Sequence, residues 1–294
     1  MPLIRRSDAV ADRHVSWSQL SYACGYQLMF HRQRAPQGPL GIAAAVGSAV
    51  GAGCEFQAIH GRGAAAAAAV ARRCLRDEIA FLQKPRERGV RWDDPPRVTK
   101  KGELYESDRG RVPDLSAAER TADRLVRSWV GAFPDLKAEK TGAEAELKIR
   151  LSKPEGWTIV CVPDIITTGR EIVDIKVADD EWTEAQFMSR RGQGLLYQAS
   201  YQQLFGEPPA RFCFHVLSRR TAEVKVWEVP FSSAAINTFL NHVARPVIRS
   251  IELEAFTPNT QGWHCSERFC SYWPICPLGQ AAHPQPPAKE VTAA

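Results

Sequence analysis

The sequence predicts an α/β protein with a central mixed β-sheet flanked by helices. Amphipathic segments with a helical period dominate the first half of the chain, and short apolar runs typical of strands follow them. Helical and strand-like segments then alternate, as they do when helices pack on a sheet. We expect one domain over residues 1–280, with a helical and loop insertion near 63–133 and a disordered tail over 281–294.

The first half is expected to be mainly helical. Ser16 or Ser18 can cap a first helix, whose apolar residues recur four apart. Ser116 and Glu119 form a capping box at the start of another helix. Helices are expected over 16–32, 42–60, 63–84 and 115–133, with loops over 33–41 and 85–113. Three glycines weaken the second of these helices and indicate close packing there: Gly47, Gly51 and Gly53.

The second half alternates between the two kinds of element. Apolar and β-branched residues predict a hairpin that turns near Thr168 and Gly169. Strands are expected over 143–152, twice within 156–178, over 210–220 and over 222–230, with helices over 183–205 and 232–252.

The composition excludes few classes of function. A formal charge of +5 is compatible with a nucleic-acid partner and equally with none. The N-terminal segment has basic residues without an apolar stretch, and no 18 apolar residues run together, so we expect neither a signal peptide nor a membrane partner. A cytoplasmic setting is expected. Thiols are normally reduced there, so the eight cysteines are expected as core residues or metal ligands.

Three charged side chains interrupt the apolar hairpin: Asp164, Asp174 and Lys176. Asp174 and Lys176 share one face of a strand, and a three-residue turn would place Asp164 opposite Asp174, with Cβ atoms roughly 5 Å apart. Carboxylates so close repel each other, and a divalent cation such as Mg²⁺ between them would reverse the sign of that interaction. Lys176 could orient an attacking water. The pattern predicts a phosphodiesterase centre; the alternative is three solvent-facing strand residues.

Two short motifs and a helix carry a family resemblance. "VPD" ends at Asp164, "DIK" spans 174–176, and "QGLLYQASYQQLFG" begins at Gln193. In this order they resemble the PD-(D/E)XK nuclease superfamily, and within it the RecB-like branch that includes CRISPR adaptation nucleases and phage exonucleases. The resemblance implies a restriction-endonuclease-like core.

The resemblance also implies roles for individual residues. Asp164, Asp174 and the main-chain carbonyl of Ile175 would hold Mg²⁺ or Mn²⁺, and Lys176 would position the water. The family's Q-x-x-x-Y helix corresponds to Gln193 and Tyr197, which share a helical face and would contact DNA. Phosphate contacts are expected from Arg190 and Arg191, unless these are ordinary solvated charges.

One departure from the family pattern concerns a metal ligand. The family's early helix carries a G-x-x-x-H motif, and here Gly51 stands where the histidine is expected. Glu55 lies one turn further along the same helical face and could ligate the metal instead. A lost ligand would leave a weakened or inactive catalytic site.

Cysteines near both ends of the chain predict a second cofactor site. Cys265, Cys270 and Cys276 make an incomplete tetrahedral site by themselves. Cys24 follows a segment similar to the N-terminal cysteine segment of iron–sulfur RecB-like nucleases, and the resemblance implies a [4Fe-4S] cluster that joins the two ends of the chain. Zn²⁺ is the alternative, with His264 in place of Cys24, and buried free thiols are a third. The other four cysteines are expected in the core.

The function that follows is a metal-dependent DNA nuclease, expected to be an exonuclease that acts on ends or single strands in recombination, phage or CRISPR-related DNA processing. A recombinase, a helicase or a CRISPR integrase is the expected kind of protein partner. The alternatives are an inactive DNA-binding protein of the same fold and a zinc-stabilised interaction protein.

Overall fold

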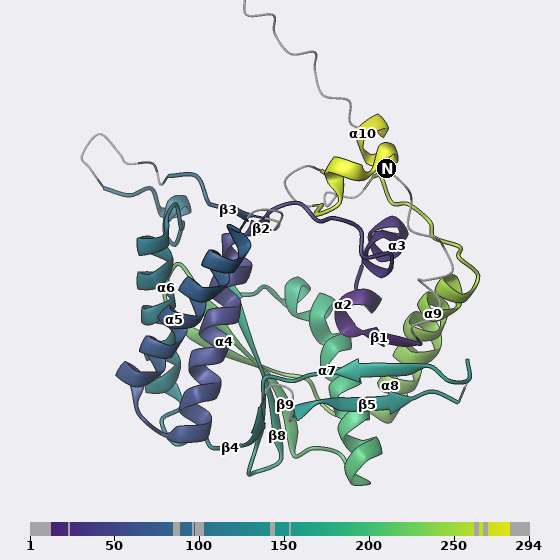
Figure 1. Cartoon of the computed structure of the whole chain (residues 1–294). Coiled ribbons are helices and arrows are strands. Elements are labelled where there is room, and N and C mark those ends of the chain that lie inside the picture. The colour runs from purple at the N-terminus through teal and green to yellow at the C-terminus, as the bar shows by residue number, and fades with distance from the viewer. Residues whose placement is uncertain are drawn as a thin grey trace, which may run out of the picture.

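The computed structural model describes residues 13–22, 24–84, 89–95, 97, 103–141, 145–152, 154–261, 265–266 and 270–282. Helices α4 (Ile42–His60), α5 (Ala64–Leu82) and α6 (Leu115–Ala132) pack side by side and cover one face of the largest sheet (Figure 1). Helix α7 (Glu184–Phe205) packs on the opposite face, between that sheet and a smaller one.

The largest sheet is mixed and has five strands. Strands β8 (Glu171–Ala178) and β9 (Arg211–Ser218) run parallel at its centre, because α7 carries the chain back between them. The outer strands are antiparallel to their neighbours and complete the order β10-β9-β8-β7-β4: β10 (Val224–Glu228), β7 (Ile165–Thr167) and β4 (Ala138–Thr141).

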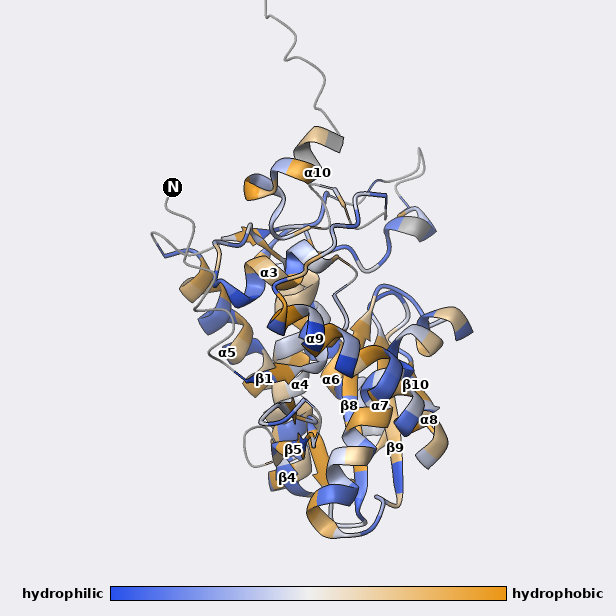
Figure 2. Cartoon of the chain, turned by 90° about the vertical axis from the view of Figure 1, so that its right-hand side faces the viewer, coloured by the Kyte–Doolittle hydropathy of each residue, from blue (hydrophilic) through white to orange (hydrophobic). Residues whose placement is uncertain are grey.

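The side chains of β8 alternate between two hydrophobic cores. Val173 and Ile175 are buried against the α4–α6 layer. Ile172 points the opposite way and is buried on the α7 side. Figure 2 shows apolar segments gathered around β8, β9 and the helices that cover them. Asp174 and Lys176 lie two and four residues after Ile172, so they share the face that α7 covers.

Gly53 lies where α4 approaches α5 and α6 most closely. A Cβ at this position would lie 2.9 Å from the Ala67 carbonyl oxygen and 2.9 Å from the Val126 side chain. Overpacking of this kind costs about 1–3 kcal/mol, and the backbone oxygen cannot move aside as a side chain could. We expect Gly53→Ala to lower the free energy of unfolding by about 2 kcal/mol, measured by urea denaturation.

Gly47, on the same helix, provides the matched control. A Cβ there would meet Val177 at 4.0 Å, an ordinary contact. Gly47→Ala should therefore raise the free energy of unfolding by about 0.5–1 kcal/mol, because alanine favours the helix more than glycine does. Equal effects of the two substitutions would show that packing does not select glycine at position 53.

The prediction of one helix over 16–32 is wrong. The segment forms strand β1 (His14–Ser16), the short helix α2 (Trp17–Leu20) and helix α3 (Gly25–Arg32). Cys24 is the N-cap of α3, and the Gly25 N–H donates to the carbonyl of Thr257 at 2.9 Å. A contact with the distant C-terminal segment therefore fixes where α3 begins.

The expected single sheet also needs correction. Strands β5 (Leu147–Arg150) and β6 (Thr158–Cys161) form a second sheet with β1, in the order β1-β6-β5. The predicted run over 156–178 is thus split, and residues 162–164 lead the chain from one sheet to the next. A third sheet pairs β2 (Leu40–Gly41) with β3 (Val90–Arg91). The mixed α/β class of the fold is confirmed.

The segment predicted as one helix over 232–252 has three parts. A π-helical turn, η3 (Leu240–Ala244), separates α8 (Ser233–Phe239) from α9 (Arg245–Glu252). Pro246 has no N–H to donate to the residue four before it, and its ring would clash with that carbonyl. The wider π-helical turn η3, which precedes Pro246, accommodates both the missing N–H donor and the proline ring.

The loop expected over 85–113 is anchored where the structure describes it. Asp108, in the 3₁₀ turn η1 (Glu106–Asp108), is 1% exposed and pairs with Arg97 at 2.7 Å and Arg111 at 3.1 Å. Arg219, which follows β9, forms an ion pair with Asp93 at 3.0 Å.

The helices of the predicted insertion, α5 and α6, belong to one of the two main hydrophobic cores. That residues 63–133 are an insertion relative to other proteins stays a prediction.

Two further expectations concern the C-terminal tail and the absence of a membrane-spanning segment. Helix α10 (Pro277–Ala282) includes residues 281 and 282 of the predicted disordered tail, and the rest of that tail lies outside the described residues. Among the described helices, α4 has the length and composition that could cross a membrane. Its apolar side chains pack between α5, α6 and β8, as in the core helix of a soluble protein.

Candidate active site

The β7–β8 hairpin sets the positions of the two predicted aspartates. Ile165 pairs with Val173 and Ile166 with Ile172, so the turn has three residues, and this predicted register is confirmed. Asp164 directly precedes β7, and its Oδ2 accepts the Ile175 N–H at 2.5 Å. The backbone of β8 therefore holds Asp164 beside Asp174.

Asp174 is the most deeply buried of the three charged residues, with 2% of its surface exposed. Its Oδ1 accepts a hydrogen bond from Gln193 Nε2 at 2.9 Å, and its Oδ2 forms an ion pair with the Lys176 ammonium. The side chain of Lys176 is 27% exposed. The three residues thus converge on one partly open site at the α7 face of β8.

The electrostatics of the site favour a cation. Burial raises the pKa of both carboxyl groups, and the neighbouring charge of Asp174 raises the pKa of Asp164 further. Lys176 lowers both pKa values and so offsets part of this effect. The single ammonium of Lys176 cannot balance the charge of two carboxylates. A cation bound nearby would favour the ionised form of both carboxyl groups.

Glu55 reaches toward the same site from α4. Its Oε1 lies 3.9 Å from where a Cβ at Gly51 would stand, so the Glu55 side chain folds back over the glycine. Burial raises the pKa of Glu55, and its charge contributes to the raised pKa of Asp164. A role for Glu55 as a substitute metal ligand stays a prediction.

The donors available here fit a hard divalent ion. Mg²⁺ and Mn²⁺ prefer oxygen ligands, and Mg²⁺ commonly takes only one or two carboxylates from the protein. Asp164 and Asp174 supply two. Within the described residues, no group of three or more His, Cys, Asp or Glu side chains encloses a metal position. The remaining ligands would then be water, substrate phosphate, the predicted Ile175 carbonyl or the predicted Glu55 carboxylate.

A family model of the PD-(D/E)XK nuclease superfamily matches residues 20–277, a range that includes the whole site. The chain belongs to the PD-(D/E)XK nuclease superfamily. Membership implies a nuclease with DNA as its substrate, and nucleases of this superfamily usually use divalent metals such as Mg²⁺ or Mn²⁺.

One solved structure shares the fold over most of both chains. The crystal structure of a predicted exonuclease from Eubacterium rectale is 15% identical in sequence, with a TM-score of 0.55 and coverage of 90% of each chain. The structure of SSO0001 is also 15% identical, with a TM-score of 0.35 and coverage of 56% of this chain and 71% of its own. No curated protein matches.

Gln193 and Tyr197 of this PD-(D/E)XK protein lie beneath the site rather than on its surface. They are 4% and 5% exposed, and Gln193 Nε2 lies 2.9 Å from the Tyr197 hydroxyl. That hydroxyl donates to the Val162 carbonyl at 3.2 Å. The pair therefore holds Asp174 in place, a role that the motif alone did not reveal; direct contact with DNA stays a prediction.

The two arginines of α7 differ in their relation to the site. Arg190 is exposed, and its charge lowers the pKa of Asp174, so it lies within electrostatic reach of the carboxylate. Arg191 is half-buried, and nothing connects it with Asp174. Of the two, Arg190 is better placed to meet a phosphate beside the site.

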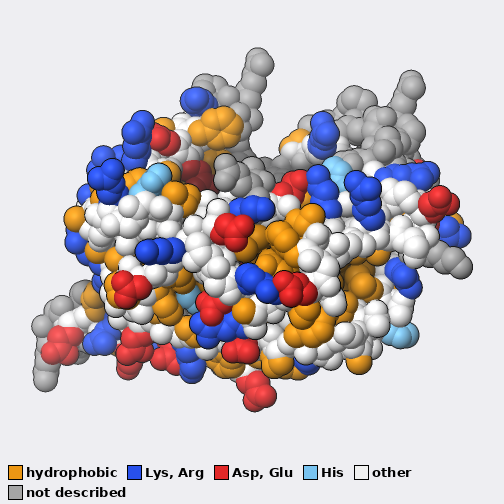
Figure 3. Space-filling model, turned by 90° about the horizontal axis from the view of Figure 1, so that it is seen from below, with side chains coloured by type: hydrophobic (Ala, Val, Ile, Leu, Met, Phe, Trp, Pro, Cys, Tyr) orange, Lys and Arg blue, Asp and Glu red, His pale blue; other side chains and the backbone are white. Residues whose placement is uncertain are grey.

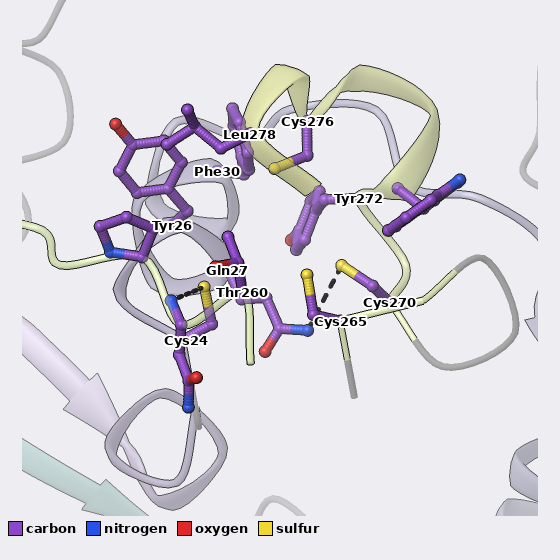
Figure 4. A pocket seen from close by; sticks show the side chains of 13 residues that line it. Cys24, Tyr26, Gln27, Phe30, Thr260, Cys265, Cys270, Tyr272, Cys276 and Leu278 are labelled. Atoms are coloured by element: carbon purple, nitrogen blue, oxygen red, sulfur yellow. Dashed lines mark hydrogen bonds between the residues drawn. The ribbon is translucent and has the colours of Figure 1, made fainter. Parts of the chain in front are cut away.

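The four predicted cysteine ligands line one cavity: Cys24, Cys265, Cys270 and Cys276 (Figure 4). Burial and the nearby Cys270, Cys276 and Cys24 raise the pKa of Cys265. The Asn259 N–H donates to Cys24 Sγ at 3.3 Å, and Gln27 Nε2 donates to Cys270 Sγ at 3.4 Å. The alternative ligand His264 lies outside the described residues.

Aromatic packing surrounds this cavity and joins the two ends of the chain. Phe30 of α3 packs on Tyr272, with ring centroids 5.6 Å apart, and Gln37 donates to the Tyr272 hydroxyl at 2.9 Å. Tyr272, the 3₁₀ turn η4 (Trp273–Ile275) and α10 come from the C-terminal segment. Phe30, Tyr272 and Cys276 form a small core of their own, separate from the two cores around β8.

Proposed function

We propose that the protein is a metal-dependent deoxyribonuclease that degrades DNA from ends or as single strands. The convergence of Asp164, Asp174 and Lys176 on one partly open site, with Asp174 fixed by a buried hydrogen bond, carries the proposal. A divalent ion held by Asp164, Asp174 and the Ile175 carbonyl, with Glu55 as a further ligand, would stabilise charge that develops on the phosphate.

The chain's own side chains would supply the rest of the chemistry. Gln193 and the Ile175 N–H fix the two carboxylates, so neither has to reorganise during the reaction. The ammonium of Lys176 would orient the attacking water and offset the negative charge of the transition state. Arg190 would hold a neighbouring phosphate.

The substrate preference rests on weaker support. The structural neighbour from Eubacterium rectale is described as a predicted exonuclease, and we propose the same mode of cleavage here. Figure 3 shows basic and acidic side chains interspersed over the face seen from below, without one continuous basic surface there.

Linear and circular DNA test this proposal directly. Purified protein is incubated with Mn²⁺ and either end-labelled linear DNA or covalently closed circles, single- and double-stranded. Release of short labelled products from linear DNA, with the circles left intact, is expected. Cleaved circles would show an endonuclease. DNA binding without cleavage by the folded protein would favour the alternative, an inactive binding protein, which the glycine at position 51 makes the second candidate.

We also propose that the cysteine cavity holds a [4Fe-4S] cluster. Four thiols on one cavity, with two N–H groups directed at sulfur atoms, support it. A single Zn²⁺ would need four ligands at about 2.3 Å from the metal, a more compact arrangement than a cluster needs.

Substitution of Cys24 tests the cofactor. Protein purified without oxygen is expected to be brown and to contain iron and sulfide, and Cys24→Ala should lose most of both. Cys74→Ala is the matched control, because Cys74 lies on α5 and does not line the cavity. A colourless protein with bound zinc would reject the cluster and leave the nuclease proposal intact.

A further inference from the structure

Both oxygens of Asp174 are occupied in this structure, but by partners that differ in freedom. Gln193 holds Oδ1 and is itself fixed through the Tyr197 hydroxyl, which is anchored on the Val162 carbonyl. Lys176 holds Oδ2 through a side chain that is 27% exposed. Gln193 is therefore held in a buried network, whereas the ammonium has a path toward solvent.

The Lys176 ammonium is paired with the carboxylate that a divalent ion would need most. It forms an ion pair with Oδ2 of Asp174, and the Ile175 N–H holds Asp164 beside that residue. The ammonium therefore supplies positive charge at the position where a divalent ion would bind. Two cations cannot share Oδ2 of a carboxylate that is 2% exposed, because their mutual repulsion is strong where water is excluded.

We propose that Lys176 is a built-in competitor of the metal. In the metal-free protein its ammonium occupies the cation position at Asp174, and the arriving ion displaces it toward the water and phosphate. This inference rests on the proposed metal dependence. Lys176 would then have two successive partners, the Asp174 carboxylate before the metal binds and the reacting groups afterwards. The competition would also make the metal affinity of the protein lower than its carboxylates alone would give.

If Lys176 competes with the metal, its removal should change the Mn²⁺ affinity in the direction opposite to that expected from structural damage. A variant that lacks the ammonium should bind Mn²⁺ more tightly, whereas a variant with a distorted site should bind it more weakly. We expect Lys176→Met to lower the dissociation constant for Mn²⁺ about tenfold in the absence of DNA. The thermal midpoint of the metal-free variant should fall, since two buried carboxyls lose their counter-charge, and Mn²⁺ should raise it more than it raises that of the wild type.

The experiment is a Mn²⁺ titration of the full chain, followed by the electron paramagnetic resonance signal of the free ion. Lys148→Met is the matched control, because Lys148 of β5 is 53% exposed and also pairs with a carboxylate, that of Glu146. It removes the same charge and should leave the affinity unchanged. Asp174→Asn should lose most of the binding. Lys176→Gln, a second neutral variant, replaces Lys176→Met if circular dichroism shows the latter to be misfolded.

The outcomes separate the inference from the function on which it rests. Tighter binding by Lys176→Met or Lys176→Gln, with Lys148→Met unchanged, supports the competition. Equal or weaker binding by both neutral variants, while wild type binds and Asp174→Asn does not, overturns the competition and leaves the metal site standing. Absence of Mn²⁺ binding by wild type and both neutral variants overturns the metal site and the inference together.

Discussion

Asp174→Asn and Lys176→Ala are each expected to lower DNA cleavage by roughly 10²–10³-fold or more, because each removes a charge from the centre of the site. Asparagine keeps an oxygen that can accept the hydrogen bond from Gln193 at nearly the same volume, so the loss should arise from chemistry rather than folding. Cleavage is measured as the initial rate on end-labelled linear DNA with saturating Mn²⁺.

Lys148→Ala is the control for the loss of a lysine, and it should cleave at the wild-type rate. Circular dichroism and thermal melting identify any variant whose fold is damaged. Undiminished cleavage by folded Lys176→Ala would remove this residue from the mechanism. Together with the Mn²⁺ titration, the expected result is a variant that holds the metal more firmly and yet hardly cleaves.

Acidification should destabilise the protein through His215, which lies 3% exposed in β9. Its Nδ1 accepts the indole N–H of Trp129 at 3.1 Å, and its ring stacks on Phe133 at 4.1 Å. Burial, and then the charge of Arg211, lower the pKa of His215 from 6.5 to about 4. The folded state therefore favours the neutral ring.

The sign of the pH effect follows from that shift. Between pH 6.5 and about 4 the unfolded chain binds a proton at this position and the folded chain does not, so stability falls as the pH falls. The contribution is fully present above pH 6.5, and its loss approaches about 3 kcal/mol near pH 4.

The measurement is urea denaturation of wild type and His215→Asn from neutral to acidic pH. Asparagine keeps an acceptor for Trp129 without a titratable ring, so the variant should be less stable at neutral pH but should lose less stability on acidification. His60→Asn removes an exposed histidine and is the matched control. Parallel curves for wild type and His215→Asn would contradict the assignment.

Local signals in the sequence predicted most of the long elements and the central hairpin. Helix α4 begins and ends at the predicted residues, 42 and 60, and a three-residue turn brings Asp164 to Asp174 as expected. These features depend on neighbours a few residues away, which a single sequence records. The same holds for the motif order that indicated the nuclease family.

Features fixed by distant contacts could not be predicted in this way. The break before α3 depends on a backbone bond between Gly25 and Thr257, and β6 leaves the hairpin to pair with β1 and β5. The burial of Gln193 also needs the tertiary structure, because four-residue spacing places it on a face with Tyr197 without saying what covers that face. The close approach of Glu55 to Gly51 is visible only in three dimensions.

The three-residue turn between β7 and β8 makes the catalytic chemistry depend on a count of residues as well as on their identity. One residue inserted into or deleted from strand β8 before Asp174 would reverse which of its side chains face α7. The side chains of Asp174 and Lys176 would then point into the hydrophobic core between β8 and α4. Relatives of this protein should therefore tolerate many substitutions in this hairpin but almost no change in its length.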